Sequence, residues 1–138
     1  MGVLDDLRLD DRVVLLTGAG RGLGRAMALE FADAGAHVVC AARSMDEIEE
    51  TATLVRECGR RSIAVSTDVT DSDAVNALVS ATLDEFSRVD VLVNNAGGGT
   101  AGEGKTLPEI DDYEWRLGID VNLSSQVYCA RAVIPHMV

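Results

Sequence analysis

The sequence predicts an α/β fold, built as a doubly wound parallel sheet that is truncated after its fourth strand–helix unit. Short apolar runs alternate with longer stretches of helical periodicity, a pattern typical of parallel strands joined by helices. The runs are apolar along most of their length, as expected for strands that helices cover on both faces. A cluster of glycines follows the first run and leads into the first helix. We therefore expect one domain over residues 1–138, incomplete at its C-terminal end.

The alternation places each expected strand before a helix. The strands are expected at about residues 12–17, 37–42, 62–67 and 89–93. The helices are expected at about residues 22–34, 44–59, 71–86 and 109–137. In the first helix, the residues expected on the buried face are Leu23, Met27, Phe31 and Ala34. The last helix is longer than an ordinary one, so a bend near residues 118–122 would divide it into two segments.

Helix ends are marked by residues with particular backbone roles. Gly35 and Gly59 suit the left-handed conformation that often ends a helix. The segment Ser44–Glu47 has the spacing of a capping box at the start of the second helix. Either Thr70 or Asp71 is expected to cap the third helix.

Composition and charge narrow the functional classes. The chain is 47% hydrophobic, with a net charge of −11. We expect no nucleic-acid partner, because phosphate contacts need clustered Lys and Arg. We expect no membrane segment, because no apolar run reaches the roughly 18 residues of a membrane helix. The three cysteines are scattered, without a metal-binding or disulfide pattern. These features predict a cytoplasmic protein with buried cysteines and no metal site.

The glycine cluster is the strongest functional signal. Glycine tolerates positive φ and close approach of a ligand, and the helix that follows offers free N–H groups to a phosphate. The dinucleotide fingerprint G-x-G-x-x-G is not met literally, because a count from Gly18 places its third glycine on Leu23. A plain turn remains the alternative. The candidate cofactor-binding residues of this turn are Thr17, Gly18, Gly20, Arg21, Gly22, Leu23 and Gly24.

Three further turns are expected at the same edge of the sheet. Right-handed crossovers place the loops after parallel strands along one edge, where ligands of doubly wound sheets bind. These loops carry Ala42–Arg43, Asp68–Val69 and Asn94–Gly97. The sequence therefore predicts a Rossmann-like fold in which four turns converge on one nucleotide crevice.

The residues of these turns resemble the short-chain dehydrogenase/reductase family. The glycine turn at 17–24 is similar to the family's cofactor motif, and Asp68–Val69 is similar to its adenine-contacting turn. Asn94–Gly97 is similar to the motif that follows the family's fourth strand, and Val121-Asn122-Leu123 resembles the segment with its catalytic asparagine. The resemblance covers about residues 10–137.

The resemblance implies a function as well as a fold. It implies an NAD(P)-dependent oxidoreductase that transfers a hydride between the cofactor and a small-molecule alcohol or carbonyl substrate. Asn122 would be the catalytic residue that holds a water for the proton relay. Asn95, Ala96 and Gly97 would line the cofactor site. In the family the last helix commonly packs against a partner subunit, which implies a homodimer or homotetramer formed through Leu123, Val127, Ala130 and Ile134.

The later part of the chain departs from the family pattern. Family members continue into a fifth strand with a serine and then a Tyr-x-x-x-Lys pair. Here Tyr113 is followed four residues later by Leu117, and Tyr128 by Ala132. Either the chain is the front part of a longer enzyme, which we favour, or it is naturally short and binds a cofactor without turnover. We expect the 138 residues alone to be inactive.

The end of the second strand bears on the choice of cofactor. NAD-binding folds place Asp or Glu about 20 residues after the first glycine, where this chain has Ala42 and Arg43. Ala42 leaves room for a 2′-phosphate, and Arg43 can donate to its oxygens, with Arg21 as a second cation. We therefore expect NADP in preference to NAD. The alternative is that Arg43 is an ordinary surface residue.

Three functional classes compete. The leading hypothesis is an NADP-preferring oxidoreductase of the short-chain type. The second is a non-catalytic NADP(H)-binding module or sensor, which a native mass no larger than this chain would favour. The third is a methyltransferase, which predicts an acidic residue at the end of the second strand, where Ala42-Arg43 stands instead.

Overall fold

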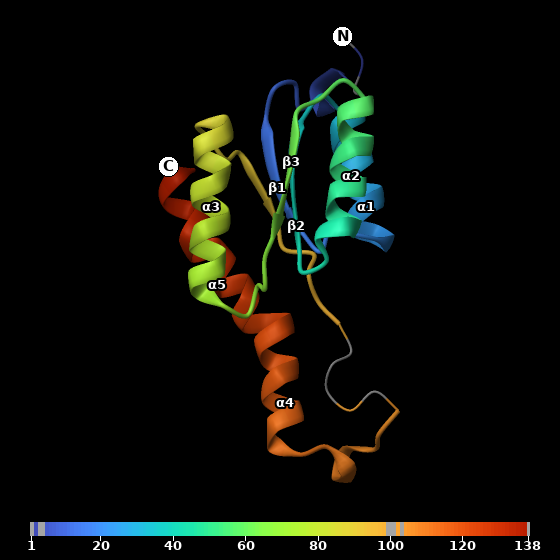
Figure 1. Cartoon of the computed structure of the whole chain (residues 1–138), viewed down its shortest axis with the longest axis vertical. Coiled ribbons are helices and arrows are strands. Elements are labelled where there is room, and N and C mark those ends of the chain that lie inside the picture. The colour runs from blue at the N-terminus through green and yellow to red at the C-terminus, as the bar shows by residue number, and fades with distance from the viewer. Residues whose placement is uncertain (1, 3–4, 99–101, 103, 138) are drawn as a thin grey trace.

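A four-stranded parallel sheet lies between two layers of helices in the computed structural model, which describes residues 2, 5–98, 102 and 104–137 (Figure 1). The strands lie in the order β3-β2-β1-β4, and all three neighbouring pairs are parallel. This arrangement confirms the doubly wound α/β fold predicted from the alternation of apolar runs and helical stretches. The strands are β1 (Val13–Thr17), β2 (His37–Ala42), β3 (Ser62–Ser66) and β4 (Val91–Val93).

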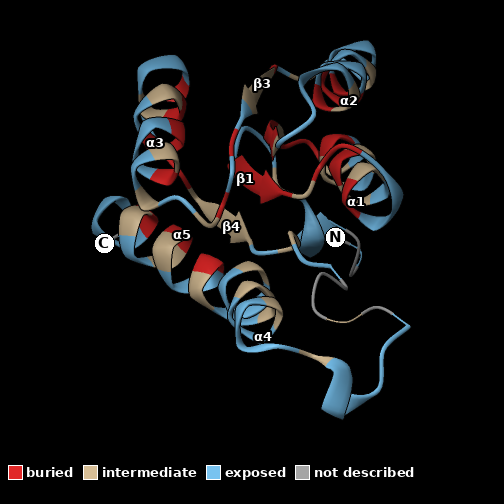
Figure 2. Cartoon of the chain, turned by 60° about the horizontal axis from the view of Figure 1, so that its bottom comes forward, coloured by how far each residue is buried: buried red, intermediate tan, exposed pale blue. Residues whose placement is uncertain are grey.

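The helices cover the sheet on both faces. α1 (Gly22–Asp33) and α2 (Met45–Glu57) lie side by side on one face, and α3 (Ser72–Phe86) and α5 (Ser125–Val133) lie on the other (Figure 1). Successive side chains of a strand point to opposite faces. Accordingly, Val14 and Leu16 of β1 join the core under α1 and α2, whereas Val13 and Leu15 join the core under α3 and α5. Figure 2 shows β1 buried between the two layers.

The buried face of α1 differs from the prediction. Gly24, Ala28 and Ala32 are the buried residues of this helix, and Leu23 is 77% exposed. Met27 and Phe31 are only partly buried and pack beside the core. The predicted buried face was therefore displaced by about one residue along the helix. The small side chains let α1 pack close to the sheet, and the large side chains lie at the sides of this helix–sheet contact.

The ends of the helices agree with the sequence at most positions. Gly35 and Gly59 have positive φ values of 101° and 82° just beyond α1 and α2. Asp71 caps α3, because its side chain accepts from the N–H of Asp73. The capping box expected at Ser44 is absent, since the Ser44 side chain makes no cap hydrogen bond.

β4 is shorter than predicted and begins at Val91. The preceding residue, Asp90, already pairs with Val13: its N–H donates to the Val13 carbonyl at 2.9 Å, and the N–H of Val13 donates to Asp90 Oδ2 at 2.8 Å. The Asp90 carboxylate, only 13% exposed, also binds Arg12 and Arg88. The regular register with β1 begins at the next residue, where Val91 pairs with Val14.

The predicted final helix is divided into several elements. A short 3₁₀ turn, η2 (Leu107–Glu109), lies at its start and another, η4 (Ile134–His136), lies near its end, and a third, η1 (Asp5–Leu7), lies near the N-terminus. α4 (Asp112–Ile119) is capped by Asp111, whose carboxylate accepts from the N–H of Glu114. A π-helical turn, η3 (Asp120–Ser124), joins α4 to α5 at the predicted bend.

α4 has no buried residue and projects past the carboxyl edge of the sheet (Figure 1). The glycine-rich loop before it falls partly on residues 99–101 and 103, outside the described residues. In the part of the chain that the structure describes, no helix is both long enough and apolar enough to cross a membrane.

Candidate functional site

The turn between β1 and α1 is built on glycines that the local geometry requires. A Cβ on Gly24 would lie 1.9 Å from the carbonyl oxygen of Gly18 and 2.9 Å from Asn95 Nδ2. Gly18 itself has φ +65°, and a Cβ there would lie 2.8 Å from Asn95 Nδ2. The start of α1 therefore packs directly on the end of β1, which only glycine allows.

Gly22 needs to be glycine for a different reason. Its φ is +55°, but a Cβ there would meet nothing within 4 Å. The N–H groups of Gly22 and Leu23 have no acceptor among the described residues, and the N-cap residue Arg21 makes no side-chain cap bond. Free donors at the positive end of a helix, beside open space, fit the phosphates of a dinucleotide.

Thr17 and Asn95 join the glycine turn to the end of β4. Asn95 Nδ2 donates to the carbonyls of Thr17 and Gly18, both at 3.1 Å. In return, Thr17 Oγ1 accepts from the N–H of Asn95 at 3.1 Å and of Ala96 at 3.0 Å, and donates to the Val93 carbonyl at 3.3 Å. These bonds hold the ends of two neighbouring strands in one fixed arrangement.

The end of β2 brings Arg43 to the same edge. The turn is tied to β2 by the N–H of Ala19, which donates to the Ala41 carbonyl at 3.2 Å. Ala42 is half-buried, and Arg43 is exposed. The guanidinium groups of Arg43 and Arg21 form no hydrogen bond or ion pair with any described residue. Two unpaired cations therefore lie at this edge of a chain whose net charge is −11.

The end of β3 is ordered by Asp68. Its carboxylate accepts from Thr70 Oγ1 at 2.7 Å and from the Thr70 N–H at 2.9 Å. These hydrogen bonds, with a smaller contribution from the Arg43 charge, hold the pKa of Asp68 below its usual value. Val69 is buried and packs in a cluster that includes Ala96. This cluster links the turns after β3 and β4, although the two strands lie at opposite sides of the sheet in the order β3-β2-β1-β4.

Asn122 lies in the π-helical turn and holds the chain that follows β4. Asn122 Oδ1 accepts from the N–H of Gly98 at 3.1 Å, and its Nδ2 donates to the carbonyls of Gly98 and Gly118, each at 3.0 Å. A Cβ on Gly97 would lie 2.9 Å from Asn122 Oδ1. Gly97 is exposed but has little room for a side chain, because Asn122 lies against it.

Most sequence-predicted site residues lie at one edge, but their contacts differ. Thr17, Gly18, Gly24, Asn95 and Ala96 touch one another directly. Leu23 is exposed in the turn rather than packed against the sheet. Arg43 and Asp68 approach from the ends of β2 and β3 without a hydrogen bond between them. Among the described residues, Asn122 is joined to the edge through the chain at residues 97–98.

Sequence reasoning missed Arg25, which binds the glycine turn. Its Nη2 donates to the Gly20 carbonyl at 2.7 Å. Nothing in the local sequence distinguishes Arg25 from a solvent-facing arginine of a surface helix. Its acceptors in α2 lie 22 or more residues further along the chain, so only the packing of the two helices brings them together.

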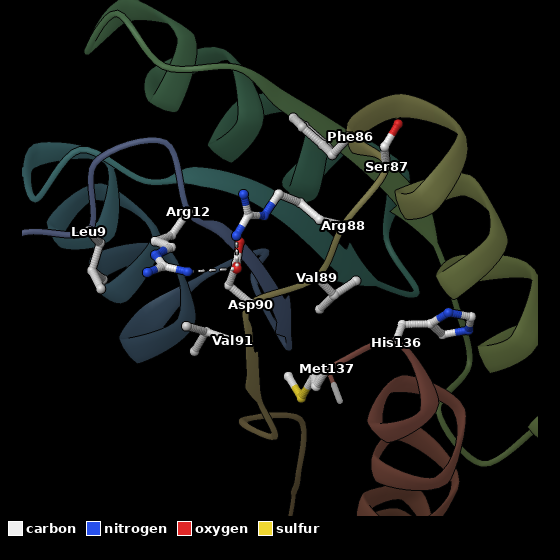
Figure 3. A pocket seen from close by; sticks show the side chains of 10 residues that line it. All are labelled: Leu9, Arg12, Phe86, Ser87, Arg88, Val89, Asp90, Val91, His136 and Met137. Carbon is white, nitrogen blue, oxygen red and sulfur yellow. Dashed lines mark hydrogen bonds and ion pairs between the residues drawn. The ribbon is translucent and has the colours of Figure 1, made fainter.

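A cavity of about 750 Å³ lies at the opposite edge of the sheet. Figure 3 shows Arg12 and Arg88 both directed at Asp90, with Val91 and Met137 on the cavity wall. Arg12 precedes β1 and Val91 begins β4, so the cavity is at the amino ends of the strands. None of the predicted site residues lines it.

Comparisons with known proteins agree with this architecture. A sequence profile of the short chain dehydrogenase family matches residues 12–138. The 3beta-hydroxysteroid dehydrogenase of Mediterraneibacter gnavus is 36% identical over 94% of this chain. The chain spans about half the length of the curated relatives it matches, 46% for this relative and 51% for another.

Two solved structures share the fold. Carveol dehydrogenase from Mycobacterium avium, in complex with NAD, has a TM-score of 0.88 and 31% identity over 94% of this chain and 50% of its own. A metagenomic short-chain oxidoreductase, in complex with NADP, has a TM-score of 0.86 and 35% identity over 94% of this chain and 57% of its own. A family profile over nearly the whole chain, together with these relatives, shows that the chain belongs to the short-chain dehydrogenase/reductase family.

Proposed function

We propose that this chain is the dinucleotide-binding part of an oxidoreductase that interconverts an alcohol and a carbonyl compound, with NADP(H) preferred over NAD(H). The observation that carries the proposal is that two arginines without a partner among the described residues, Arg21 at the N-cap of α1 and Arg43 at the end of β2, lie at the same edge of the sheet as the free N–H groups of the glycine turn. Phosphate oxygens are the natural partners of such a set of donors. Family membership supports the oxidoreductase class.

Each part of the edge would hold a different part of the cofactor. The N–H groups of Gly22 and Leu23 would bind the pyrophosphate at the start of α1. Arg43 and Arg21 would bind the 2′-phosphate, for which a carboxylate at the end of β2 would be a repulsive neighbour. The turn at Asp68–Val69 would border the adenine, following the family resemblance.

The nicotinamide supplies the hydride when the cofactor is bound. Asn95, Ala96 and Gly97 would line its side of the crevice at the end of β4. Asn122 would hold the water of the proton relay, with its side chain already engaged by Gly98 and its backbone carbonyl accepting from Gln126 Nε2 at 2.8 Å. The substrate would be a small-molecule alcohol or carbonyl, and a cytoplasmic location remains a prediction.

Calorimetric titration of NADP⁺ and NAD⁺ into the purified chain tests the cofactor proposal. A charge-assisted hydrogen bond contributes about 1.5–3 kcal/mol, so NADP⁺ should bind roughly 10- to 100-fold more tightly. Arg43→Ala should remove most of this preference. Arg116→Ala, which removes an exposed arginine of α4, should leave it unchanged. Equal affinities in the parent chain would overturn the assignment, and a preference retained in Arg43→Ala would transfer it to Arg21.

We also propose that these residues bind the cofactor without turnover. General acid catalysis requires a proton donor within hydrogen-bond reach of the reacting oxygen, and neither Tyr113 nor Tyr128 is followed by the lysine that the family pairs with its tyrosine. The measurement is NADPH absorbance with a panel of ketones and aldehydes. Steady turnover that Gly22→Val abolishes would contradict this proposal.

The last helical segment supports a homodimer or homotetramer. Leu123, Val127 and Ile134 are 57%, 54% and 54% exposed, so an apolar stripe along η3, α5 and η4 is uncovered. Burying such side chains against a second copy would be favourable by about 25 cal/mol per Å² of apolar surface. Light scattering should give a multiple of 14.6 kDa. Val127→Asp should shift the mass to one chain, whereas Asn76→Asp on α3 should not.

A further inference from the structure

Arg25 joins the glycine turn to α2 through several hydrogen bonds. Besides its 2.7 Å bond to the Gly20 carbonyl, Nη2 donates to Glu50 Oε2 at 2.9 Å and to the Glu47 carbonyl at 3.3 Å. Its Nε donates to Thr51 Oγ1 at 3.1 Å. The Arg25 side chain is 27% exposed. The guanidinium therefore lies mostly within the contact between the two helices and not in open solvent.

The bond to Gly20 determines how the turn is presented. The carbonyl of Gly20 and the N–H of Arg21 belong to one planar trans peptide. Holding that carbonyl therefore fixes the orientation of the Arg21 backbone, which is the N-cap of α1. The turn also touches α2 at this point, because a Cβ on Gly20 would lie 3.0 Å from Glu47 Cβ. One side chain thus fixes the backbone from which the first cation extends.

The same side chain holds the part of α2 that leads to the second cation. Arg43 directly precedes Ser44, the N-cap of α2, and the Ser44 side chain makes no cap bond that would fix this junction. The acceptors Glu47 and Thr51 lie in the first two turns of α2. The Arg43 carbonyl also accepts from Ser66 Oγ at 3.0 Å, so β3 holds the strand side of Arg43 while Arg25 holds the helix side.

We infer that Arg25 is a positioning residue for cofactor specificity: it sets the spacing between Arg21 and Arg43 and so makes both available to one 2′-phosphate. The inference rests on the proposed function of those two arginines. It assigns a role to a residue that touches neither the phosphate nor the nicotinamide site.

The chemistry of the side chain explains why arginine is needed. A guanidinium presents donors in a rigid planar fork, so one group can bind the Gly20 carbonyl and Thr51 Oγ1 at the same time. A lysine has a single nitrogen on a flexible stem and can favour one acceptor or the other. Glu50 is 64% exposed, and its ion pair with Arg25 is therefore a minor part of the arrangement.

The test compares Arg25→Met and Arg25→Lys with a matched arginine at the other end of α2. Arg56 donates from Nε to the Ser62 carbonyl at 3.1 Å and binds Glu49, so Arg56→Met removes similar contacts away from the nucleotide edge. The readout is the ratio of NADP⁺ to NAD⁺ affinity in the full 138-residue chain. Thermal stability is measured alongside, because both arginine-to-methionine variants should be less stable.

Arg25→Met should lower the NADP⁺/NAD⁺ affinity ratio roughly 3- to 10-fold, less than Arg43→Ala, because Arg43 is displaced and not deleted. Arg25→Lys should give an intermediate ratio, and Arg56→Met the parent ratio. If Arg25→Met keeps the NADP⁺/NAD⁺ affinity ratio of the parent chain while Arg43→Ala loses the preference for NADP⁺, the inference about Arg25 is overturned. The proposed function would still stand in that case. A parent chain without any preference would overturn the proposed function.

A second measurement needs no ligand. Backbone ¹⁵N relaxation of the chain should show lower order parameters at residues 19–22 and 42–46 in Arg25→Met, and unchanged values in Arg56→Met. If the order parameters of both segments in Arg25→Met equal those of the parent chain, the positioning role is overturned. This outcome does not depend on which cofactor the parent chain prefers.

Discussion

Thr17 and Asn95 satisfy each other's polar groups across the ends of β1 and β4: the Asn95 amide donates to the Thr17 carbonyl, and the Thr17 hydroxyl accepts from the Asn95 N–H. Thr17 is only 1% exposed. The contact replaces the regular strand ladder at the point where β4 ends and the crevice begins. The site and the sheet therefore depend on the same pair of residues.

Thr17→Val should destabilise the fold by about 1–3 kcal/mol, because the N–H of Ala96 would lose its acceptor and the N–H of Asn95 would keep only the Val93 carbonyl. Thr17→Ser keeps the hydroxyl and loses one methyl group, which should cost about 1 kcal/mol. Urea unfolding followed by circular dichroism measures both. Equal losses for the two variants would show that the hydroxyl has no such role.

Gly24→Ala and Gly22→Ala should separate folding from binding. A Cβ on Gly24 collides with the Gly18 carbonyl, so this variant should lose several kcal/mol of stability or fail to accumulate as folded protein. Gly22→Ala places its Cβ in open space and should lose only about 1–2 kcal/mol through its positive φ.

Unfolding curves measure the loss of stability in each glycine variant, and NADP⁺ titrations measure the loss of binding. Gly22→Ala should bind NADP⁺ at least about tenfold more weakly, because its Cβ occupies the phosphate approach. Unchanged NADP⁺ affinity in a folded Gly22→Ala chain would place the phosphate elsewhere.

Asp90 should make the fold acid-sensitive below about pH 4. Burial raises the pKa of Asp90, but hydrogen bonds from Arg88, the Val13 N–H and Arg12 outweigh it and leave the pKa lowered. A carboxyl whose pKa is lowered on folding stabilises the protein above its unfolded pKa of about 3.9, and this stabilisation is lost as the pH falls through the folded pKa.

The measurement is the difference in free energy of unfolding between the parent and Asp90→Asn across the pH range. The difference should be largest near pH 7 and shrink below about pH 4. Asp84→Asn, at an exposed position of α3, should show no comparable change. A pH-independent difference for Asp90→Asn would rule out its ionisation as the cause.

The three cysteines should react at different rates. Burial raises the pKa of Cys40 to about 11, and burial also raises the pKa of Cys129. Cys58 is exposed, which corrects the expectation that all three would be buried. A thiol-specific reagent should therefore modify one cysteine quickly in the folded chain and three in urea. Cys58→Ser should abolish the fast phase, and a fast phase that survives would show that a buried thiol is accessible.

The sequence predicted the sheet and the site edge well because both depend on local patterns. Apolar runs mark the strands, and loops after parallel strands must share an edge. The phase of α1 was missed because Gly24, Ala28 and Ala32 look unremarkable in a hydrophobic pattern, yet close packing selects small side chains. Arg25 was missed because its partners are distant in sequence. Contacts between helices depend on their tertiary arrangement, which single-residue patterns do not encode.

The π-helical turn sets the rotational phase of everything after it. A π-helical turn accommodates an extra residue, so deleting one residue within Asp120–Ser124 would restore an α-helical turn and leave α5 in its present phase. Rewinding the turn as a regular α-helix with all its residues kept would instead rotate α5 by about 100°, the advance of an α-helix per residue. Cys129 and Val133, now buried against the sheet, would swing towards solvent. The extra residue thus lets two faces be satisfied at once: Asn122 of the π-helical turn binds Gly98, and α5 keeps its apolar face on the core.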